Sequence, residues 1–219
     1  MRVGTVRATG APVPVYLIET DDGRHVLVDT GYPRAAAGPV EPAEAVDRQL
    51  ARLGIAPADI DYVVCSHLDP DHAGNHDLFP NARFVVQDAH YRAALAGHPQ
   101  RVRVARASWD RPGLRYERVS GDVRLLPGVD LVESSGHVPG HQSVLVHLAN
   151  RPPVLLAVDA IPTTQALDPQ RRPMYPFDLD ETQVRAATRK LVDLAAREGA
   201  EIVCGHDAEQ WATLPECYS

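Results

Sequence analysis

The sequence predicts an α+β fold in which sheets are covered by helices, within one domain that spans residues 1–219. The length suits one large domain, and a hydrophobic fraction of 44% is enough to build its core. Runs with strand character dominate the first and middle parts of the chain. Helical segments separate the groups of strands, an order typical of sheets covered by helices.

The N-terminal part of the chain alternates strand and helix patterns. The turn Asp21–Gly23 joins two apolar runs and predicts a β-hairpin. Residues 41–53 have apolar side chains at helical spacing, with Pro42 near the start and Gly54 after the end. We expect strands over residues 13–19, 25–28, 61–66 and 83–87, helices over 41–53 and 88–96, and a helical turn over 71–79.

The clearest helix of the C-terminal part covers residues 181–198, because Asp180 can cap its first turn and Gly199 can end it. Residues 97–113 are rich in Arg and contain Pro and Gly, and residues 161–179 are rich in Pro, so we expect both segments to be irregular. We expect strands over residues 115–119, 122–126, 130–134, 142–148, 153–158 and 202–204.

The net charge of the chain argues against nucleic acid as a partner. With 29 acidic and 22 basic residues the net charge is −7, whereas binding of nucleic acid needs a basic face. The longest apolar run, Val154–Val158, is far shorter than the about 20 residues of a membrane span, and the N-terminus has no signal-peptide pattern. Three cysteines are too few for a disulfide scaffold. We expect a cytoplasmic protein that binds a small-molecule substrate, and the sequence leaves its oligomeric state open.

The densest group of chemically active residues lies in Ser66–Gly74, directly after a predicted buried strand. Its four ligand-type side chains are His67, Asp69, Asp71 and His72. Imidazole and carboxylate groups are the usual protein ligands of divalent zinc, iron and manganese. The alternative interpretation is a polar loop in which Asp71 caps a helix.

Three further ligand-type side chains also follow predicted strands. They are His137 in the Gly- and Pro-rich turn Gly136–Gln142, Asp159 and His206. Side chains on loops at strand ends can meet at one edge, while the sheet fixes their positions. The combination favours a metal site over a capped polar loop.

These motifs resemble those of the metallo-β-lactamase fold and, within it, of the N-acyl homoserine lactonase family. The HxxxDH pattern of His67–His72 and the GHxPGH turn of Gly136–His141 are specific in combination, and Gly205–Gln210 points to the lactonase branch. The other matching segments are Tyr16–Thr20, Val28–Gly31, Gly74–Asn75 and Asp159–Ala160, so the resemblance covers most of the chain.

The resemblance implies an αββα sandwich with two metal ions at one sheet edge, and a metal-bridging hydroxide that hydrolyses a lactone, ester or thioester. Two cations lower the pKa of a shared water and polarise a carbonyl together. Asp71 would also pass a proton to the leaving oxygen, and Asp29 would orient a ligand. The implied ligands are His67, position 69 and His137 for the first ion, Asp71, His72 and His206 for the second, and Asp159 between the two.

Asp69 departs from the family pattern, which has His at this position. A carboxylate still binds metal, but its negative charge lowers Lewis acidity and favours iron or manganese over zinc. We expect two divalent ions, zinc first, with iron or manganese as alternatives because of Asp69. Since Asp is shorter than His, the side chain reaches the ion directly, through water, or not at all.

Two further departures concern the substrate. The family has Tyr three residues after the bridging Asp, where this chain has Pro162, which has no donor. Tyr175 is the substitute candidate in the loop that follows. The segment between Gly31 and the first predicted helix is short, so neither acyl-homoserine-lactone specificity nor dimerisation carries over from the resemblance.

Structural interpretations are favoured for most of the remaining candidates. We expect Cys65 and Cys204 to be buried, Trp109 to pack in a core, and His141 to support a ligand or face the substrate. The other histidines are expected to be exposed or locally hydrogen-bonded: His25, His76, His90, His98 and His147. A basic stretch is read as a solvated loop, or alternatively as a site for an anionic substrate group: Arg101, Arg103, Arg106 and Arg111.

Two other functions compete with hydrolysis. Asp69 motivates iron-dependent redox chemistry on the same fold, and Asp69 together with Pro162 motivates a degenerate member that binds a small molecule without turnover. Six of the seven ligand positions keep their residue type, and the seventh is still a metal-binding side chain. The sequence therefore favours a metal-dependent hydrolase.

Overall fold

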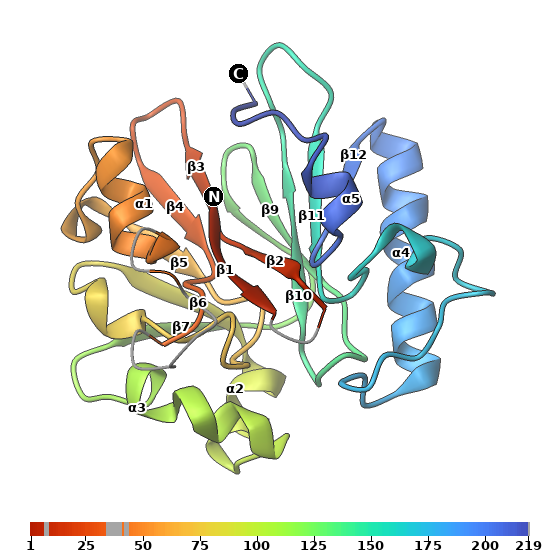
Figure 1. Ribbon diagram of the computed structural model, residues 1–219, viewed down its shortest axis with the longest axis horizontal. Helices are drawn as coiled ribbons and strands as arrows, with labels where there is room; N and C mark the ends of the chain where they lie inside the picture. The colour runs from red at the N-terminus through yellow and green to blue at the C-terminus, as the bar shows by residue number, and fades with distance from the viewer. Residues whose placement is uncertain (7–8, 34–40, 42–43, 219) are drawn as a thin grey trace. The chain divides into compact units, whose positions relative to one another are not determined.

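The computed structural model describes residues 1–6, 9–33, 41 and 44–218, which belong to two units (Figure 1). One unit comprises Met1–Val119 and the other Ser120–Ser219. Each contains a five-stranded sheet, and the first also contains a small sheet of β1 (Arg2–Val6) and β2 (Ala11–Pro14). Within the described ranges, none of the helices combines the length and apolar character that a bilayer span requires. A single domain over residues 1–219 stays a prediction.

The large sheet of the first unit has the strand order β3-β4-β5-β6-β7. Its strands are β3 (Tyr16–Glu19), β4 (His25–Val28), β5 (Tyr62–Val64), β6 (Arg83–Gln87) and β7 (Arg115–Val119). β3 and β4 form the predicted hairpin, and β4 to β7 run parallel. The carboxyl ends of β4 and β5 therefore lie at the same edge, where Asp29 and His67 follow them.

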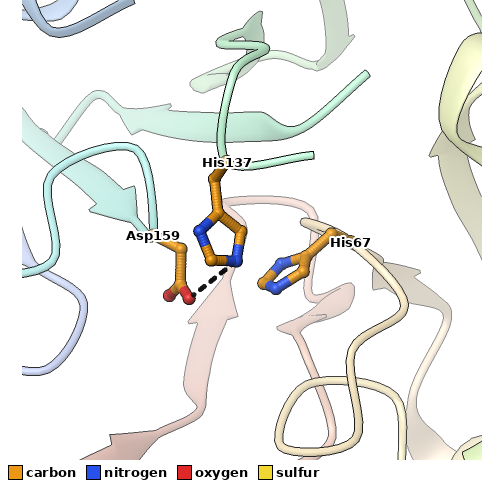
Figure 2. Close-up of side chains that lie close together, drawn as sticks. All are labelled: His67, His137 and Asp159. Atoms are coloured by element: carbon orange, nitrogen blue, oxygen red, sulfur yellow. Dashed lines mark ion pairs between the residues drawn. The ribbon is translucent and has the colours of Figure 1, made fainter. Parts of the chain in front are cut away.

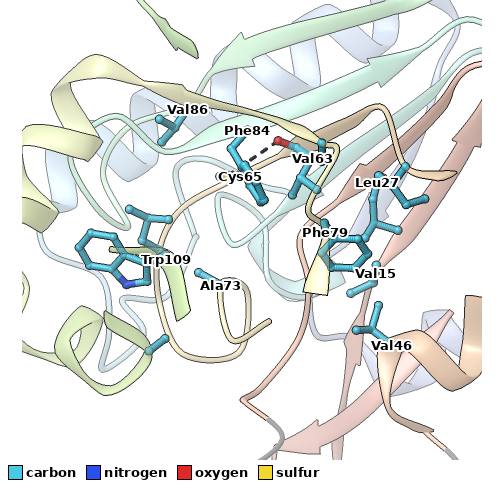
Figure 3. Close-up of a cluster of buried hydrophobic side chains, with 14 of the residues drawn as sticks. Val15, Leu27, Val46, Val63, Cys65, Ala73, Phe79, Phe84, Val86 and Trp109 are labelled. Atoms are coloured by element: carbon cyan, nitrogen blue, oxygen red, sulfur yellow. Dashed lines mark hydrogen bonds between the residues drawn. The ribbon is translucent and has the colours of Figure 1, made fainter. Parts of the chain in front are cut away.

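The core of the first unit is built from both sheets and from short helices. Figure 3 shows a cluster of buried side chains that includes Leu27 and Val63 of the large sheet as well as Val46 and Trp109, all 2% exposed or less. Cys65 belongs to the same cluster, and burial raises the pKa of its thiol, so the structural interpretations of Cys65 and Trp109 are confirmed. The helices are α1 (Val46–Arg52), η2 (Pro57–Asp59), η3 (His76–Leu78), α2 (Asp88–Leu95), η4 (Gln100–Ala105) and α3 (Arg106–Trp109).

The sheet of the second unit has the order β12-β11-β10-β9-β8. Its strands are β8 (Val123–Leu126), β9 (Val129–Glu133), β10 (Gln142–Val146), β11 (Val154–Val158) and β12 (Glu201–Cys204). β10 is antiparallel to both β9 and β11, and β11 is parallel to β12, so β9, β11 and β12 share one direction. Their carboxyl ends lie at one edge, where His137, Asp159 and His206 follow them.

Helix α4 (Glu181–Glu198) covers the sheet of the second unit and has the predicted ends. Asp180 accepts a 2.9 Å hydrogen bond from the backbone N–H of Gln183, and Gly199 ends the helix with a φ of 65°. Its buried face, which includes Leu191, packs against β11 and β12 in the core that contains Leu155. Two short helices, η5 (Thr164–Ala166) and α5 (Ala208–Trp211), complete the unit.

The helical turn predicted for residues 71–79 is wrong except for η3. The carbonyl of Asp69 accepts hydrogen bonds from the backbone N–H groups of both His72 and Ala73, which closes a tight turn. The Asn75 side chain then donates to the carbonyls of Thr30 and Tyr32, each at 2.7 Å. These contacts tie the segment to the end of β4 and stop a regular helix.

Other element boundaries also differ from the predictions. The strand expected over residues 13–19 divides at Val15, because β2 pairs with β1 while β3 pairs with β4. The segment 97–113, expected to be irregular, contains η4 and α3, which bury apolar side chains in the core. Pro42, near the predicted start of the helix expected over residues 41–53, lies outside the described residues, and α1 begins at Val46.

His76 is a buried side chain whose protonation opposes folding. Its Nδ1 lies 2.8 Å from the Tyr116 hydroxyl, and burial lowers its pKa to about 3. As the pH falls from 6.5 toward 3, the unfolded chain takes up a proton that the folded chain does not, so stability decreases. We expect this group to remove about 2 kcal/mol of unfolding free energy between about pH 7.5 and about pH 5. Urea unfolding of the wild type and of His76→Gln at the two pH values measures this effect. The variant should lose less unfolding free energy than the wild type between the two pH values, because it lacks the buried imidazole. Equal losses in the wild type and the variant would contradict the assignment.

Candidate functional site

Asp29 is the acceptor that organises the candidate residues of the first unit. It follows β4 with a φ of 63°, a left-handed backbone that non-glycine residues rarely adopt. Its carboxylate accepts hydrogen bonds from the Ser66 backbone N–H at 2.8 Å and from the Ser66 hydroxyl at 2.6 Å. Asp29 Oδ2 also lies 2.8 Å from Nδ1 of His72. The contact fixes the His72 ring, so that Nε2 is the nitrogen presented to a ligand.

His72 and Asp71 form the first of four pairs in which the Nε2 atom of a candidate imidazole ligand faces a carboxylate. Nε2 of His72 lies 3.5 Å from Oδ2 of Asp71. The His72 side chain is 1% exposed, whereas that of Asp71 is 19% exposed. A partly exposed carboxylate beside a buried imidazole can exchange protons with the solvent or with a bound molecule.

His67 and Asp69 form the second pair. Nδ1 of His67 lies 3.0 Å from the Ser66 hydroxyl, and Nε2 lies 3.4 Å from Oδ2 of Asp69. The same Asp69 oxygen accepts a hydrogen bond from Nε of Arg101. For Arg101 the solvated-loop interpretation is therefore wrong, because its guanidinium contacts an internal acid.

His137 of the second unit contacts a carboxylate on each side of its ring. It lies in the loop between β9 and β10, and its Nδ1 is 3.2 Å from Oδ1 of Asp178. Nε2 is 3.3 Å from Oδ2 of Asp159, the ion pair drawn in Figure 2. Asp178 thus orients His137 in the way that Asp29 orients His72.

The sequence reasoning missed Asp178 and its partner Arg172. Both side chains are 0% exposed, and Nη1 of Arg172 lies 2.7 Å from Oδ2 of Asp178. Burial would raise the pKa of Asp178, but hydrogen bonds from His137 and Arg172 hold it below the ordinary value. The two residues lie in the Pro-rich segment 161–179, where no periodic pattern could have indicated them.

His206 completes the pairs of the second unit. Its Nε2 lies 3.1 Å from Oδ1 of Asp159, so Asp159 faces His137 with one oxygen and His206 with the other. A Cβ atom at Gly205 would lie 2.5 Å from the carbonyl oxygen of Val158, so only glycine fits without a shift. This close approach brings the ends of β11 and β12 together and places Asp159 beside His206.

The donor chemistry fits divalent metal ions. Each of the four imidazole Nε2 atoms lies 3.1–3.5 Å from a carboxylate oxygen. Two ligand atoms at about 2.1 Å from one tetrahedral ion are about 3.4 Å apart. Four of the predicted ligands belong to the first unit: His67, Asp69, Asp71 and His72. The other three belong to the second unit: His137, Asp159 and His206.

The structure also gives the contacts of the other candidate residues. His141 is buried with Nδ1 2.8 Å from the Ser134 hydroxyl, and burial raises the pKa of Cys204 to about 12. His76 and His90 are buried and contact residues far away in the sequence, so the expectation of exposed or locally bonded rings is wrong for these two. The hydroxyl of Tyr175 lies 2.7 Å from that of Thr163.

Known sequences identify the family. Residues 8–206 match the model of the metallo-beta-lactamase superfamily. The chain is 37% identical over 229 residues to the N-acyl homoserine lactonase AttM of Azorhizobium caulinodans, covering 93% of this chain and 84% of that protein. It is 34% identical over 216 residues to an N-acyl homoserine lactonase of Bacillus sp, covering 91% and 82%.

A solved structure agrees with this assignment. An N-acyl homoserine lactone hydrolase with the product N-hexanoyl-L-homoserine bound at its catalytic metal centre aligns with a TM-score of 0.83 and 31% identity, over 94% of this chain and 85% of that one. The predicted α+β fold class of the metallo-β-lactamase type is confirmed. The chain therefore belongs to the metallo-β-lactamase superfamily and, within it, to the N-acyl homoserine lactonase family of hydrolases.

Proposed function

We propose that the protein is a metal-dependent hydrolase of N-acyl homoserine lactones. The observation that carries the proposal is the pairing of every candidate imidazole with a carboxylate at 3.1–3.5 Å. Support for the lactone comes from the relatives at 34–37% identity, which are named N-acyl homoserine lactonases. Zinc as the metal and a cytoplasmic location belong to the same proposal.

The proposed ligands would hold two divalent ions. By the family resemblance, His67, Asp69 and His137 would hold the first, Asp71, His72 and His206 would hold the second, and Asp159 would be shared. When bound, such ions polarise a carbonyl and lower the pKa of a coordinated water to about 7. Two carboxylates outside the ligand set, Asp29 and Asp178, hold the rings of His72 and His137 in place.

Asp71 is proposed to carry the proton of the reaction. Its partial exposure and its contact with His72 allow it to accept a proton from the attacking water and to donate that proton to the ring oxygen when the C–O bond breaks. One lactone and one water then give one hydroxy acid, with no further reactant.

Tyr175 is proposed to supply the hydroxyl that Pro162 lacks. Its contact with Thr163, the residue next to Pro162, keeps the phenol close to the position where the family has Tyr. A phenol there can donate a hydrogen bond to the substrate.

The contact between Asp69 and Arg101 favours hydrolysis over iron redox chemistry. The negative charge of Asp69 is the reason to consider iron, and the guanidinium of Arg101 offsets that charge. The Asp69–Arg101 pair then has a net charge near zero, as a neutral histidine at position 69 would have.

A panel of lactones, esters and thioesters tests the proposed function. The protein is assayed by proton release as purified, after treatment with a chelator, and after reloading with Zn²⁺, Mn²⁺ or Fe²⁺. We expect turnover of N-acyl homoserine lactones that chelation abolishes and a divalent ion restores. Stoichiometric ligand binding without turnover under every metal condition would support the binding-only alternative instead.

A further inference from the structure

We propose that Arg101 weakens metal binding at Asp69, because it acts as a fixed internal cation on that carboxylate. Arg101 is a positioning residue, since it contacts a proposed ligand. The inference rests on the proposed function, because it concerns the ion that His67 and Asp69 would share. The expected result is that this ion binds more tightly once the guanidinium is removed.

The geometry places two groups on one carboxylate oxygen. Oδ2 of Asp69 lies 3.4 Å from Nε2 of His67 and accepts the hydrogen bond from Nε of Arg101. The Asp69 side chain is 5% exposed and that of Arg101 is 21% exposed, so little water screens the pair. Arginine side chains in proteins carry a positive charge.

The backbone holds both partners in place. The carbonyl of Asp69 accepts two hydrogen bonds of 3.0 Å, from the backbone N–H groups of His72 and Ala73. Arg101 lies in η4, where the next residue, Val102, is 0% exposed and accepts a 3.2 Å hydrogen bond from the Trp109 indole. Neither side chain can leave the contact through a backbone shift without disturbing this packing.

An ion at Oδ2 of Asp69 must therefore share that oxygen with a guanidinium or displace it. Both cases weaken binding, because the two cations repel each other and the hydrogen bond is lost or lengthened. Removal of the guanidinium is thus expected to tighten the binding of an ion at Asp69.

Zinc titration of the metal-free protein against a chromophoric chelator tests this effect. We expect one Zn²⁺ site to bind about tenfold or more tightly in Arg101→Met than in the wild type, the size typical of changes beside metal ligands. Arg103→Met, which changes an exposed arginine of the same η4 helix, is the matched control and should titrate like the wild type. Zinc counted by mass spectrometry after dialysis should rise toward two per chain in Arg101→Met.

Two further variants keep the test decisive if Arg101→Met folds poorly. Arg101→Lys keeps the charge and should keep the wild-type Zn²⁺ affinities. In an Asp69→Asn background, Arg101→Met should no longer change the Zn²⁺ affinities, because the two residues act through one contact. Zn²⁺ affinities that Arg101→Met leaves unchanged or weakens would overturn the inference and leave the proposed function standing. A chain that binds no Zn²⁺, Mn²⁺ or Fe²⁺ would overturn both.

Discussion

His72→Ala is expected to reduce kcat/KM for an N-acyl homoserine lactone by about 10³-fold or more and to remove about one ion per chain. His72 is 1% exposed between two carboxylates, with Nδ1 2.8 Å from Asp29 and Nε2 3.5 Å from Asp71. Its loss removes a ligand of the proposed second ion and leaves both acids without this base. Steady-state kinetics and metal analysis of the same preparation measure the two effects together.

His147→Ala is the matched control. The His147 ring is 36% exposed and contacts Asp130 at 2.9 Å on the surface of the second unit. We expect wild-type kinetics and metal content from this variant. Wild-type turnover in His72→Ala would contradict the proposed function, whereas a loss of metal without a loss of turnover would contradict the role of the second ion.

Arg172→Met is expected to lower the free energy of unfolding by about 3–5 kcal/mol, the range for breaking a buried ion pair. Both Arg172 and Asp178 are 0% exposed, and the guanidinium contacts both oxygens of Asp178 at 2.7 and 3.3 Å. Methionine fills part of the volume but leaves the carboxylate buried without its cation. Thermal unfolding should show a midpoint lower by roughly 10 °C or more.

The pH dependence of this loss gives an internal check. Hydrogen bonds lower the pKa of Asp178 against the effect of burial, so the pair stabilises the fold above the ordinary Asp pKa, and this contribution is lost as the pH falls through the lowered value. The difference between Arg172→Met and the wild type should therefore shrink in acid. Arg171→Met, at the exposed neighbouring position, should unfold like the wild type. A loss in Arg172→Met no larger than in this control would contradict the assigned energy.

Local chemistry in the sequence predicts the strand ends and the helix caps. Asp180 and Gly199 define α4 because a cap needs only residues that adjoin the helix. His67, Asp159 and His206 could be placed at strand ends because a short apolar run followed by a polar loop is a local pattern. Their grouping as ligands came from the family resemblance and stays a proposal.

Contacts between distant residues could not be predicted in this way. Asp69 and Arg101 are 32 positions apart in the sequence. No sequence pattern pairs an acid in one loop with a base in a distant segment that is predicted to be exposed to solvent. Asp178 and Arg172 are only six apart, but they lie where Pro residues remove any periodic pattern. The division of the strand at Val15 depends on pairing partners, which the sequence of one strand does not specify.

The buried Arg172 also has a consequence for the loop that carries it. Residues 161–179 have little regular structure, yet Arg172 donates to the carbonyl of Ala160 at 3.3 Å, and the carbonyl of Gly136 accepts hydrogen bonds from the backbone N–H groups of Leu179 and Asp180 at 3.0 Å each. These contacts order the loop when the chain folds, so its conformational entropy is lost at that stage and not when a ligand binds. Residues 161–179 are thus expected to keep one conformation when a ligand binds. Selection among ligands by this segment would then depend on how well a ligand fits its fixed shape, and not on a movement of the segment over the ligand.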